Sequence, residues 1–442
     1  MSRAAALVMA AVMLLCPAEA ITYEPDFTPT SKAVYLENLD TGLILYEKNA
    51  DEKMYPASLT KIMTAIVVLE NVKDLDGETA EYPMWIQNML YGTNASLGGL
   101  IVGEELTIRQ LLTSALVQSG NESAMILAGY VGSGGMADFM PRDITTFVEM
   151  MNDKAKALGC TGTHFTNPTG LHSDNTYTTA RDMAIMAKYA MQKSAFSSIV
   201  KNYAVQLGQT NKHADLWQYS TNKMLLTSSP YYYAPVVGIK TGSTDEAGRC
   251  VISPAEDSGY HYFCVVMGSP VTAAEPYQNF IETRQLYRWA FGNFSLRTLL
   301  EQGELMAEVP VKYSGDGKVA KLAIKEDVVQ LLRDDISLDS IIYKAELPEF
   351  VEAPIAAGDT VGKMHVMLMG EEIGTVELVA TQAFSLSWFR KALGTIGSLL
   401  SSTVAKVIFI VVVLAIAGYI VYAVRHNKKR KKHRSKYSDR NY

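Results

Sequence analysis

The sequence predicts an α+β fold in which an antiparallel sheet is covered by helices. A small all-β, sandwich-like domain and a C-terminal transmembrane helix follow. In residues 30–298, strand-like and helix-like runs are interspersed without a βαβ repeat. Residues 305–382 are short alternating runs separated by Gly and Pro. Residues 407–424 carry no charge, and these 18 residues are near the minimum length for crossing a bilayer.

The charge of the chain is divided unevenly along its length. The 442 residues carry a net charge of −6, but residues 425–442 contain nine Lys or Arg and one Asp. Once that tail's +8 is set apart, residues 21–424 carry about −14, because the first 20 residues are neutral overall. Such an acidic body argues against nucleic acid as a partner.

Residues 1–20 are typical of a secretory signal peptide. Arg3 precedes the apolar run 4–15, and Ala18-Glu19-Ala20 fits a cleavage site. The alternative, a membrane anchor, is disfavoured because the apolar run is short.

The C-terminal region predicts a single-pass protein of the cell membrane. A span at 406–424 is followed by the basic tail 425–442, and the positive-inside rule places that tail in the cytoplasm and the body outside. Before the span, residues 384–405 predict an amphipathic juxtamembrane helix. Its apolar stripe is Leu386, Phe389, Leu393, Ile396 and Leu400. This stripe would lie at the membrane interface or pack against the β domain.

Near the N-terminus of the body, "KAVYLENLDTGLILYEKNAD" predicts a β-hairpin with a turn at Asp40-Thr41-Gly42. A helix then begins after Pro56, with Ser58 or Thr60 available as its cap. Beyond Lys61 this helix is apolar nearly all round and is therefore expected to be buried. A lysine in its first turn needs a partner or a function.

Further elements are predicted along the body. Helices are expected at 105–131, at 143–158, from about Thr179, and at 274–291, with strands at 235–240, 248–253 and 261–268. The mature chain keeps Cys160, Cys250 and Cys264, an odd number. Cys250 and Cys264 could form a bridge or remain as two buried thiols.

Three short motifs occur in order along the body: Ser58-x-x-Lys61, Ser119-Gly120-Asn121 and Lys240-Thr241-Gly242. The first pattern also occurs at Ser198/Lys201 and Ser220/Lys223, and the second at 173–175 and 220–222. The ordered set therefore carries more weight than any member, and it is the combination typical of penicillin-interacting serine enzymes.

The residue types of the first motif suit acyl transfer. A serine hydroxyl is a weak nucleophile and needs an adjacent base. Lys61 lies three residues after Ser58, on the same face of the helix. Burial favours the neutral lysine, which can accept the hydroxyl proton.

With these motifs the chain resembles the serine D-alanyl-D-alanine carboxypeptidases, the low-molecular-mass penicillin-binding proteins. The resemblance extends to "NPTGLHSDNTYTTARDMAIMAKYA", "TNKMLL" and "KTGSTDEAG", and it covers roughly residues 30–295 strongly. It also explains the two additional Ser-x-Asn matches, at 173–175 and 220–222, because both lie in segments that resemble other parts of the family sequence. It implies a β-lactamase/transpeptidase-like catalytic domain at 21–298. The all-β domain at 299–383 matches the family's usual C-terminal domain more loosely.

The resemblance also implies the site. Ser58, Lys61 and Ser119 would be catalytic, and the backbone N–H groups of Ser58 and Ser243 would form the oxyanion hole. The expected substrate-binding residues are Asn121, Lys240, Thr241, Gly242, Ser243 and Thr244. Lys240 would be a fixed cation suited to the terminal carboxylate of the substrate. The substrate would be a peptidoglycan stem peptide, β-lactams would act as inhibitors, and no metal or cofactor is expected.

Several alternatives stay open. A D,D-endopeptidase or a β-lactamase could use the same site, and a non-catalytic wall-binding protein is a third class. Ser243 and Arg249 stand where family members vary and often carry larger or aromatic residues, so substrate preference is undecided. His164, His172 and His261 are expected to be loop or surface residues, and the oligomeric state is not predicted.

Overall fold

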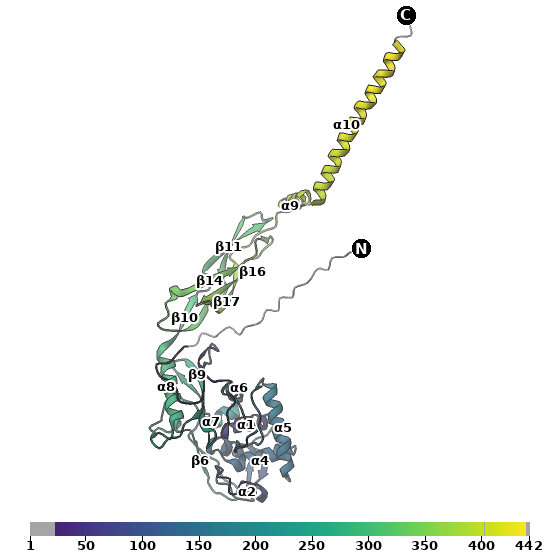
Figure 1. Cartoon of the computed structure of the whole chain (residues 1–442). Coiled ribbons are helices and arrows are strands. Elements are labelled where there is room, and N and C mark those ends of the chain that lie inside the picture. The colour runs from purple at the N-terminus through teal and green to yellow at the C-terminus, as the bar shows by residue number, and fades with distance from the viewer. Residues whose placement is uncertain (1–22, 402, 439–442) are drawn as a thin grey trace. The chain divides into compact units, whose positions relative to one another are not determined.

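The computed structural model describes residues 23–401 and 403–438, and their side chains for 23–394 and 406–428. The signal peptide expected at 1–20 lies outside the described residues. The chain divides into two compact units (Figure 1). The first reaches Leu296 and includes Leu331–Ile336, and the second comprises Arg297–Gln330 and the chain from Ser337 onward.

The first unit is built on a five-stranded antiparallel sheet in the order β2-β1-β9-β8-β7. Its strands are β1 (Ala33–Asn38), β2 (Ile44–Lys48), β7 (Lys240–Thr244), β8 (Gly248–Asp257) and β9 (Tyr260–Ser269). The hairpin β1–β2 is confirmed. Its turn is closed by Asn38, whose Oδ1 accepts hydrogen bonds from Asp40 N and Thr41 N at 3.2 and 2.9 Å.

Alternation along the strands gives the sheet two buried faces. Tyr35 and Val265 enter one hydrophobic cluster, whereas Leu36 and Val266 enter the other. The first cluster is covered by most of the helices, and the second by α8 (Gln278–Asn293). The predicted α+β class, with helices covering an antiparallel sheet, is therefore confirmed.

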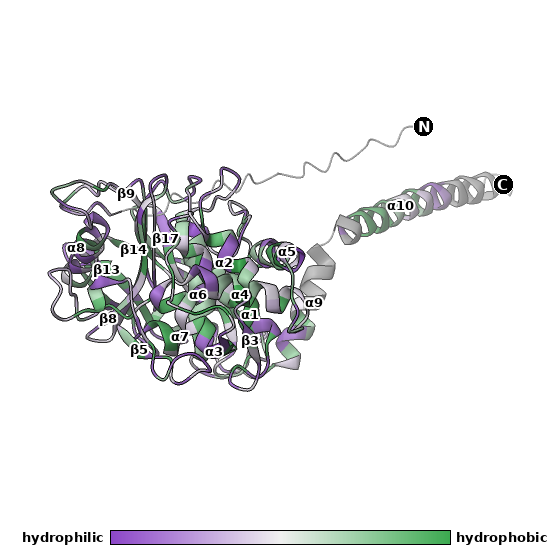
Figure 2. Ribbon diagram, turned by 90° about the horizontal axis from the view of Figure 1, so that it is seen from below, coloured by the Kyte–Doolittle hydropathy of each residue, from purple (hydrophilic) through white to green (hydrophobic). Residues whose placement is uncertain are grey.

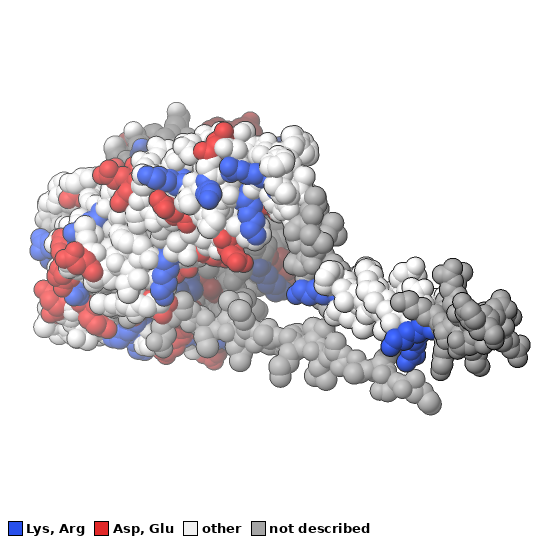
Figure 3. Space-filling view, turned by 90° about the horizontal axis from the view of Figure 1, so that it is seen from above, with Lys and Arg blue, Asp and Glu red and all other residues white. Residues whose placement is uncertain are grey.

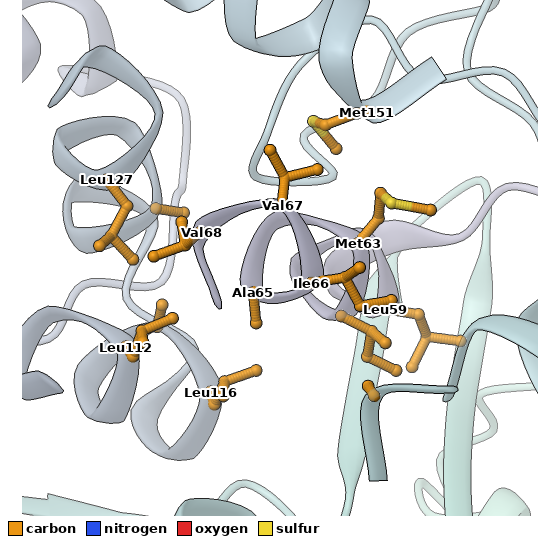
Figure 4. Close-up of a cluster of buried hydrophobic side chains, with 14 of the residues drawn as sticks. Leu59, Met63, Ala65, Ile66, Val67, Val68, Leu112, Leu116, Leu127 and Met151 are labelled. Carbon is orange, nitrogen blue, oxygen red and sulfur yellow. The ribbon is translucent and has the colours of Figure 1, made fainter. Parts of the chain in front are cut away.

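The helix α1 (Lys61–Asn71) lies in the centre of the first cluster, where its side chains meet Leu112, Leu116, Leu127 and Met151 (Figure 4). The other helices of this unit are α2 (Met84–Leu90), α3 (Ile108–Thr113), α4 (Asn121–Gly132), α5 (Pro141–Ala157), α6 (Ala180–Met191) and α7 (Ser194–Val200). Short elements are η1 (Ala57–Thr60), η2 (Ser114–Gln118), η3 (Lys223–Leu225), β3 (Thr79–Glu81), β4 (Glu105–Thr107), β5 (Ala204–Gln206) and β6 (Trp217–Tyr219).

Two sequence predictions about these elements are wrong. The helix expected at 105–131 is divided: α3 runs into the π-helix η2, and α4 starts only after Ser119 and Gly120. The strand expected at 235–240 actually starts at Lys240, because Pro235 and Gly238 interrupt the preceding ladder. The expected strand would have ended where the Lys240-Thr241-Gly242 motif begins. In the structure the motif instead forms the first three residues of β7.

Among the described residues, the three cysteines are free and buried. Cys250 lies in the cluster on one face of the sheet and Cys264 in the cluster on the other. A bridge between them is excluded because the sheet separates the two thiols.

The second unit is an all-β domain, as predicted. A six-stranded sheet has the order β14-β16-β17-β12-β11-β15, and β10 pairs with β13 where the chain passes between the two units. The strands are β10 (Phe294–Leu300), β11 (Leu305–Lys312), β12 (Val319–Ile324), β13 (Val328–Arg333), β14 (Ile341–Glu346), β15 (Val351–Glu352), β16 (Thr360–Leu368) and β17 (Glu371–Ala380), with the turn η4 (Leu338–Ser340).

Two helices end the chain, α9 (Trp388–Ser401) and α10 (Thr403–Ser438). In α9 the predicted apolar stripe is exposed where its side chains are described: Phe389 is 74% and Leu393 53% exposed. The side chains of Ile396 and Leu400 lie outside the described residues. The helix and the segment before it both touch the β domain: Arg390 donates a hydrogen bond to the Ser314 carbonyl at 2.6 Å, and Leu386 forms a bridge with Ser314.

Within α10, Lys406–Lys428 is long and apolar enough to cross a membrane, and none of it is buried against protein. Figure 2 shows these turns largely in the hydrophobic colour, and Figure 3 shows them free of acidic groups. This apolar helix is compatible with membrane anchoring.

Candidate active site

Ser58 lies at the start of the segment that becomes α1. The chain passes through Ala57, at φ +47°, into η1 and then into α1. Neither Ser58 nor Thr60 caps the helix, contrary to the sequence prediction: no side-chain cap hydrogen bond forms at either helical start. The Ser58 hydroxyl instead faces Lys61, with 3.0 Å between Oγ and Nζ.

Lys61 is fully enclosed. It is 1% exposed, and its Nζ donates hydrogen bonds to Asn121 Oδ1 and to the Thr169 carbonyl, both at 2.7 Å. Burial, followed by repulsion from Lys240, holds the pKa of Lys61 well below its ordinary value. Two of the three hydrogen-bonding positions of Lys61 Nζ are thus occupied by the Asn121 and Thr169 oxygens, and the third points at Ser58 Oγ. The neutral amine would place its lone pair there to accept the serine proton.

The Asn167–Leu171 loop positions the carbonyl acceptor for Lys61. Asn167 Oδ1 accepts hydrogen bonds from the backbone N–H groups of Thr169 and Gly170 at 3.1 and 2.8 Å. Gly170 has φ +80°, and a Cβ there would stand only 1.8 Å from the Ala57 carbonyl oxygen. The glycine therefore allows the loop to lie directly against the backbone that carries Ser58.

Ser119 occupies the break between η2 and α4. Its backbone is left-handed, with φ +66° and ψ +30°, which is unfavourable for a residue with a side chain. The π-turn before it and the start of α4 after it turn Ser119 toward the cavity, whereas Asn121 points at Lys61. A continuous helix could not bring both residues to the same site, because side chains at i and i+2 would lie on different faces.

The third motif lies beside the nucleophile because Gly242 has no side chain. A Cβ at Gly242 would stand 3.1 Å from Ser58 N and 2.9 Å from the Pro56 carbonyl oxygen. Thr241 is held by a 2.6 Å hydrogen bond from its Oγ1 to Thr221 Oγ1. Gly242 is among the substrate-binding residues that the resemblance implies, and its missing side chain also admits the backbone that bears Ser58.

Lys240 and Thr244 lie apart from the rest of the third motif. Lys240 is 1% exposed, its Nζ donates to the Thr241 carbonyl at 2.9 Å, and burial lowers its pKa to about 7. The Thr244 hydroxyl accepts a hydrogen bond from Ala247 N at 3.0 Å and so closes the β7–β8 turn. Neither residue lines the cavity that contains Ser58.

That cavity has a volume of about 290 Å³. Of the predicted site residues it contains Ser58, Ser119, Thr241, Gly242 and Ser243, whereas Lys61 and Asn121 lie buried behind it. Sequence reasoning did not assign a role to its other lining residues, which are Ser96, Thr221, Lys223, Arg249, Cys250, Tyr277, Asn279 and Phe280. Lys223 belongs to one of the additional Ser-x-x-Lys patterns, which recur in the chain, so this spacing alone could not have indicated that Lys223 lines the cavity.

Glu122 was also missed. This buried carboxylate accepts a 2.6 Å hydrogen bond from Gly98 N, and burial raises its pKa. It holds the loop that brings Ser96 to the cavity wall. Among the described residues, no three His, Cys, Asp or Glu side chains are placed to hold a metal ion.

Comparison with known proteins agrees with this geometry. Residues 19–271 match the family model "D-alanyl-D-alanine carboxypeptidase", and residues 294–385 match the model "Penicillin-binding protein 5, C-terminal domain". The chain is 29% identical over 399 residues to the D-alanyl-D-alanine carboxypeptidase DacF of Bacillus subtilis, covering 88% of this chain and 96% of the relative. It is 28% identical over 370 residues to DacA of Escherichia coli, covering 80% and 83%.

Solved structures give the same result. Penicillin-binding protein 5 of Haemophilus influenzae superposes with a TM-score of 0.61 at 26% identity, covering 82% of this chain and all of that one. The Streptomyces K15 DD-transpeptidase superposes with a TM-score of 0.55 at 30% identity, covering 61% of this chain and all of that one.

Proposed function

The chain belongs to the D-alanyl-D-alanine carboxypeptidase family of serine hydrolases, and on that basis we propose that Ser58 is its nucleophile. The substrate is a peptidoglycan stem pentapeptide. Ser58 attacks the carbonyl of the penultimate D-Ala, the terminal D-Ala leaves, and water releases the acyl-enzyme. The observation that carries this proposal is the buried Lys61 amine, 3.0 Å from Ser58 Oγ.

Each group near Ser58 has a proposed role in that reaction. Lys61 accepts the hydroxyl proton as Ser58 attacks, and Ser119 passes a proton to the leaving amine. The backbone N–H groups of Ser58 and Ser243 stabilise the oxyanion. The close approach of Gly242 to Ser58 N supports this pairing, because Ser243 is the next residue.

The remaining predicted residues hold the substrate. The β7 strand pairs with the extended peptide, and Thr241, Gly242 and Ser243 line that edge. Asn121 orients Lys61 and binds the substrate amide. Lys240 contributes a positive charge behind β7, and Thr244 maintains the turn that ends this strand. β-Lactam antibiotics would acylate the same serine.

We also propose a membrane topology. The apolar helix Lys406–Lys428 would span the bilayer once, with both folded units on the cell-wall side and the basic tail in the cytoplasm. The exposed Trp388, Phe389 and Leu393 of α9 suit the interface above the span. Protease treatment of right-side-out vesicles should remove the folded units and leave a tail protected.

The function is tested with the full-length protein in detergent. D-Alanine release from a pentapeptide ending in D-Ala-D-Ala is measured for the wild type and for Ser58→Ala. We expect loss of at least about 10³-fold in the variant, because Ser58 supplies the only hydroxyl hydrogen-bonded to the Lys61 amine in the described part of the chain. Ser198→Ala, in an unrelated Ser-x-x-Lys pattern, serves as the matched control. Undiminished release by Ser58→Ala would overturn the assignment of the nucleophile.

The acyl-enzyme could also be resolved by an amine instead of water. The similar Streptomyces K15 protein is a DD-transpeptidase, and the superposition covers its whole chain. Adding an amino acceptor such as glycine to the same assay separates the two outcomes, since transfer yields a new peptide in addition to D-alanine.

A further inference from the structure

A buried carboxylate beside the site has no role in the proposed mechanism. Glu122 follows Asn121 in the first turn of α4 and is only 1% exposed. Asn121 is the residue whose Oδ1 accepts a hydrogen bond from Lys61 Nζ at 2.7 Å. A carboxylate is rarely buried this deeply unless it is paired, because it loses its hydration. Glu122 therefore needs an explanation in the fold or in the reaction.

One oxygen of Glu122 is fixed by the backbone. Its Oε1 accepts a hydrogen bond from Gly98 N at 2.6 Å. Gly98 can come this close because it has no side chain: a Cβ there would stand 2.0 Å from Ser114 Oγ. The carboxylate is therefore held in one orientation at the N-terminal end of α4, where the helix dipole favours a negative charge.

The other oxygen of Glu122 is left without a partner. Among the described residues, no group donates a hydrogen bond to the buried Oε2, and no cation forms an ion pair with this carboxylate. The hydroxyls of Ser114 and Ser123, which lie on the same side of the Gly98 loop, bond to each other at 2.8 Å. Buried acceptors are seldom left unpaired in native proteins, so anchoring the loop explains only half of this group.

The charge of Glu122 acts on Lys61. Burial and then repulsion from Lys240 lower the pKa of Lys61, and the charge of Glu122 opposes both. The relation is mutual: burial raises the pKa of Glu122, whereas the backbone N–H groups around it and the charge of Lys61 lower that pKa. Glu122 also acts on Tyr82, whose pKa is raised to about 12 by burial and then by this carboxylate. Lys61 is thus subject to a cation from β7 and a carboxylate from α4.

We propose that Glu122 is a positioning residue of the acyl transfer, whose carboxylate stabilises the ammonium that forms on Lys61. This inference rests on the proposed function, in which Lys61 is the base for Ser58. As Ser58 attacks, its O–H bond breaks and the proton forms a third N–H bond on Lys61 Nζ. The ammonium has only neutral acceptors in contact, Asn121 Oδ1 and the Thr169 carbonyl. Glu122 adds the negative charge and exchanges no proton itself.

Glu122 and Lys240 have opposite effects on the same amine. A general base works best when its pKa lies near the working pH, because it must be unprotonated before the step and basic during it. The charge of Lys240 keeps Lys61 from being protonated before the attack. The charge of Glu122 keeps Lys61 basic enough to take the proton from Ser58.

The test follows the acylation of Ser58 against pH, with the full-length protein in detergent and a fluorescent penicillin as the probe. Glu122→Gln removes the charge but keeps an oxygen that can accept from Gly98 N. The acid limb of the acylation rate should shift to lower pH, because Lys61 then loses its proton more readily. The plateau should fall by about tenfold, because a weaker base accepts the serine proton. D-Alanine release from the pentapeptide should show the same shift.

Glu104→Gln is the matched control. Glu104 is also fully buried and also accepts from a backbone N–H of this loop, that of Ile101 at 2.8 Å. It pairs with His213 at 2.8 Å, and its charge is not among those that act on Lys61. The acid limb of this variant should therefore stay at the wild-type pH.

Two further variants at position 122 separate charge from packing. Glu122→Asp keeps the charge and should shift the limb less than Glu122→Gln. Glu122→Met removes the charge and should shift the limb as Glu122→Gln does. Its apolar side chain of similar length suits a buried position, so it gives the same measurement if the glutamine variant folds poorly.

The direction of the shift decides the outcome. An acid limb that stays at the wild-type pH or moves to higher pH in Glu122→Gln and Glu122→Met overturns the inference. An equal shift in Glu104→Gln also overturns it, because loosening of the loop would then be the cause. Acylation by penicillin does not require the peptide. A shifted acylation limb without any D-alanine release would therefore support the role of Glu122 and count against the proposed substrate alone.

Discussion

Two buried lysines of the first unit and one exposed lysine of the second unit are held in opposite ways. In the first unit, Lys61 and Lys240 are each 1% exposed, and neither forms an ion pair among the described residues. In the second, Lys325 pairs with Glu377 while their side chains remain 52% and 42% exposed. Burial without a counter-ion disfavours the charged amine and lowers its pKa, whereas an exposed pair stays charged and contributes little to stability. The difference shows where the molecule sacrifices stability for chemistry.

Replacing Lys61 with Met should have the largest effect of these substitutions. It separates the effect on activity from the effect on stability. D-Alanine release should fall at least about 10³-fold because the base is gone. The free energy of unfolding should change by no more than about 2 kcal/mol, because a poorly solvated amine is removed together with its hydrogen bonds. Release kinetics and thermal denaturation of the full-length protein measure both.

Lys61→Arg is the control for that experiment. Arginine keeps a cation of similar length but is never deprotonated near neutral pH, so it should be equally inactive. Activity within tenfold of the wild type in either variant would contradict the role of the neutral amine.

Gly170→Ala should disturb the site through the backbone. Its Cβ would stand 1.8 Å from the Ala57 carbonyl oxygen, so the loop must move and Thr169 must leave Lys61. We expect a loss of about 2 to 4 kcal/mol in unfolding free energy together with reduced activity. Gly42→Ala is matched to it, because Gly42 has φ +73° but no neighbour within 4 Å. That variant should lose only about 1 kcal/mol and no activity; equal losses would show that the contact with Ala57 is unimportant.

Lys240→Gln should move the pH profile. The charge of Lys240 lowers the pKa of Lys61, so its removal raises that pKa and more of the base is protonated at a given pH. The acid limb of kcat/KM should therefore shift to higher pH, whatever happens to the absolute rate. An acid limb at the wild-type pH would show that the two lysines are not coupled.

The same variant should also change how the free energy of unfolding depends on pH. The folded-state pKa of Lys240 is about 7, below its ordinary value of 10.5, so the unfolded chain binds more protons between these values. Lys240 therefore makes stability rise with pH through that window. In thermal denaturation, the stability of Lys240→Gln should rise less with pH in this window than that of the wild type. A variant in the second unit that leaves Lys240 intact should keep the wild-type rise.

Lys325→Gln should have the smallest effect. It removes the exposed pair with Glu377, which lies in the unit without the nucleophile. We expect a change of less than about 1 kcal/mol in unfolding free energy and unaltered D-alanine release. A larger loss of stability would show that the Lys325–Glu377 pair contributes more than exposed ion pairs usually do.

Several features could be predicted from local sequence because each depends on neighbours along the chain. The hairpin around Gly42 follows from alternation and a turn residue, and Thr179 caps α6 by accepting from Asp182 N at 3.0 Å. The break at Ser119 could not be predicted. Runs rich in Leu and Ala lie on both sides of Gly120, and a single glycine does not by itself show that a helix ends there; packing of η2 and α4 against the rest of the unit fixes the break. The same applies to Lys223, whose local pattern was a coincidence and whose place in the cavity is set by long-range contacts.

The sequence by itself determined the order of the motifs, the α+β class, the all-β second unit and the apolar helix near the C-terminus, since each follows from period, spacing or composition over a few residues. Only the tertiary structure decided which residues of the site contact one another, how deeply they are buried and how their pKa values shift. The pKa of Lys61 is lowered because the fold buries its amine, which donates hydrogen bonds to Asn121 and Thr169, residues 60 and 108 positions away. Arg249 and Lys223 line one cavity with Tyr277, a residue from a third element, and both cations lie over its ring. Burial, and the pKa values that follow from it, depend on what surrounds a side chain in space, which no local pattern specifies.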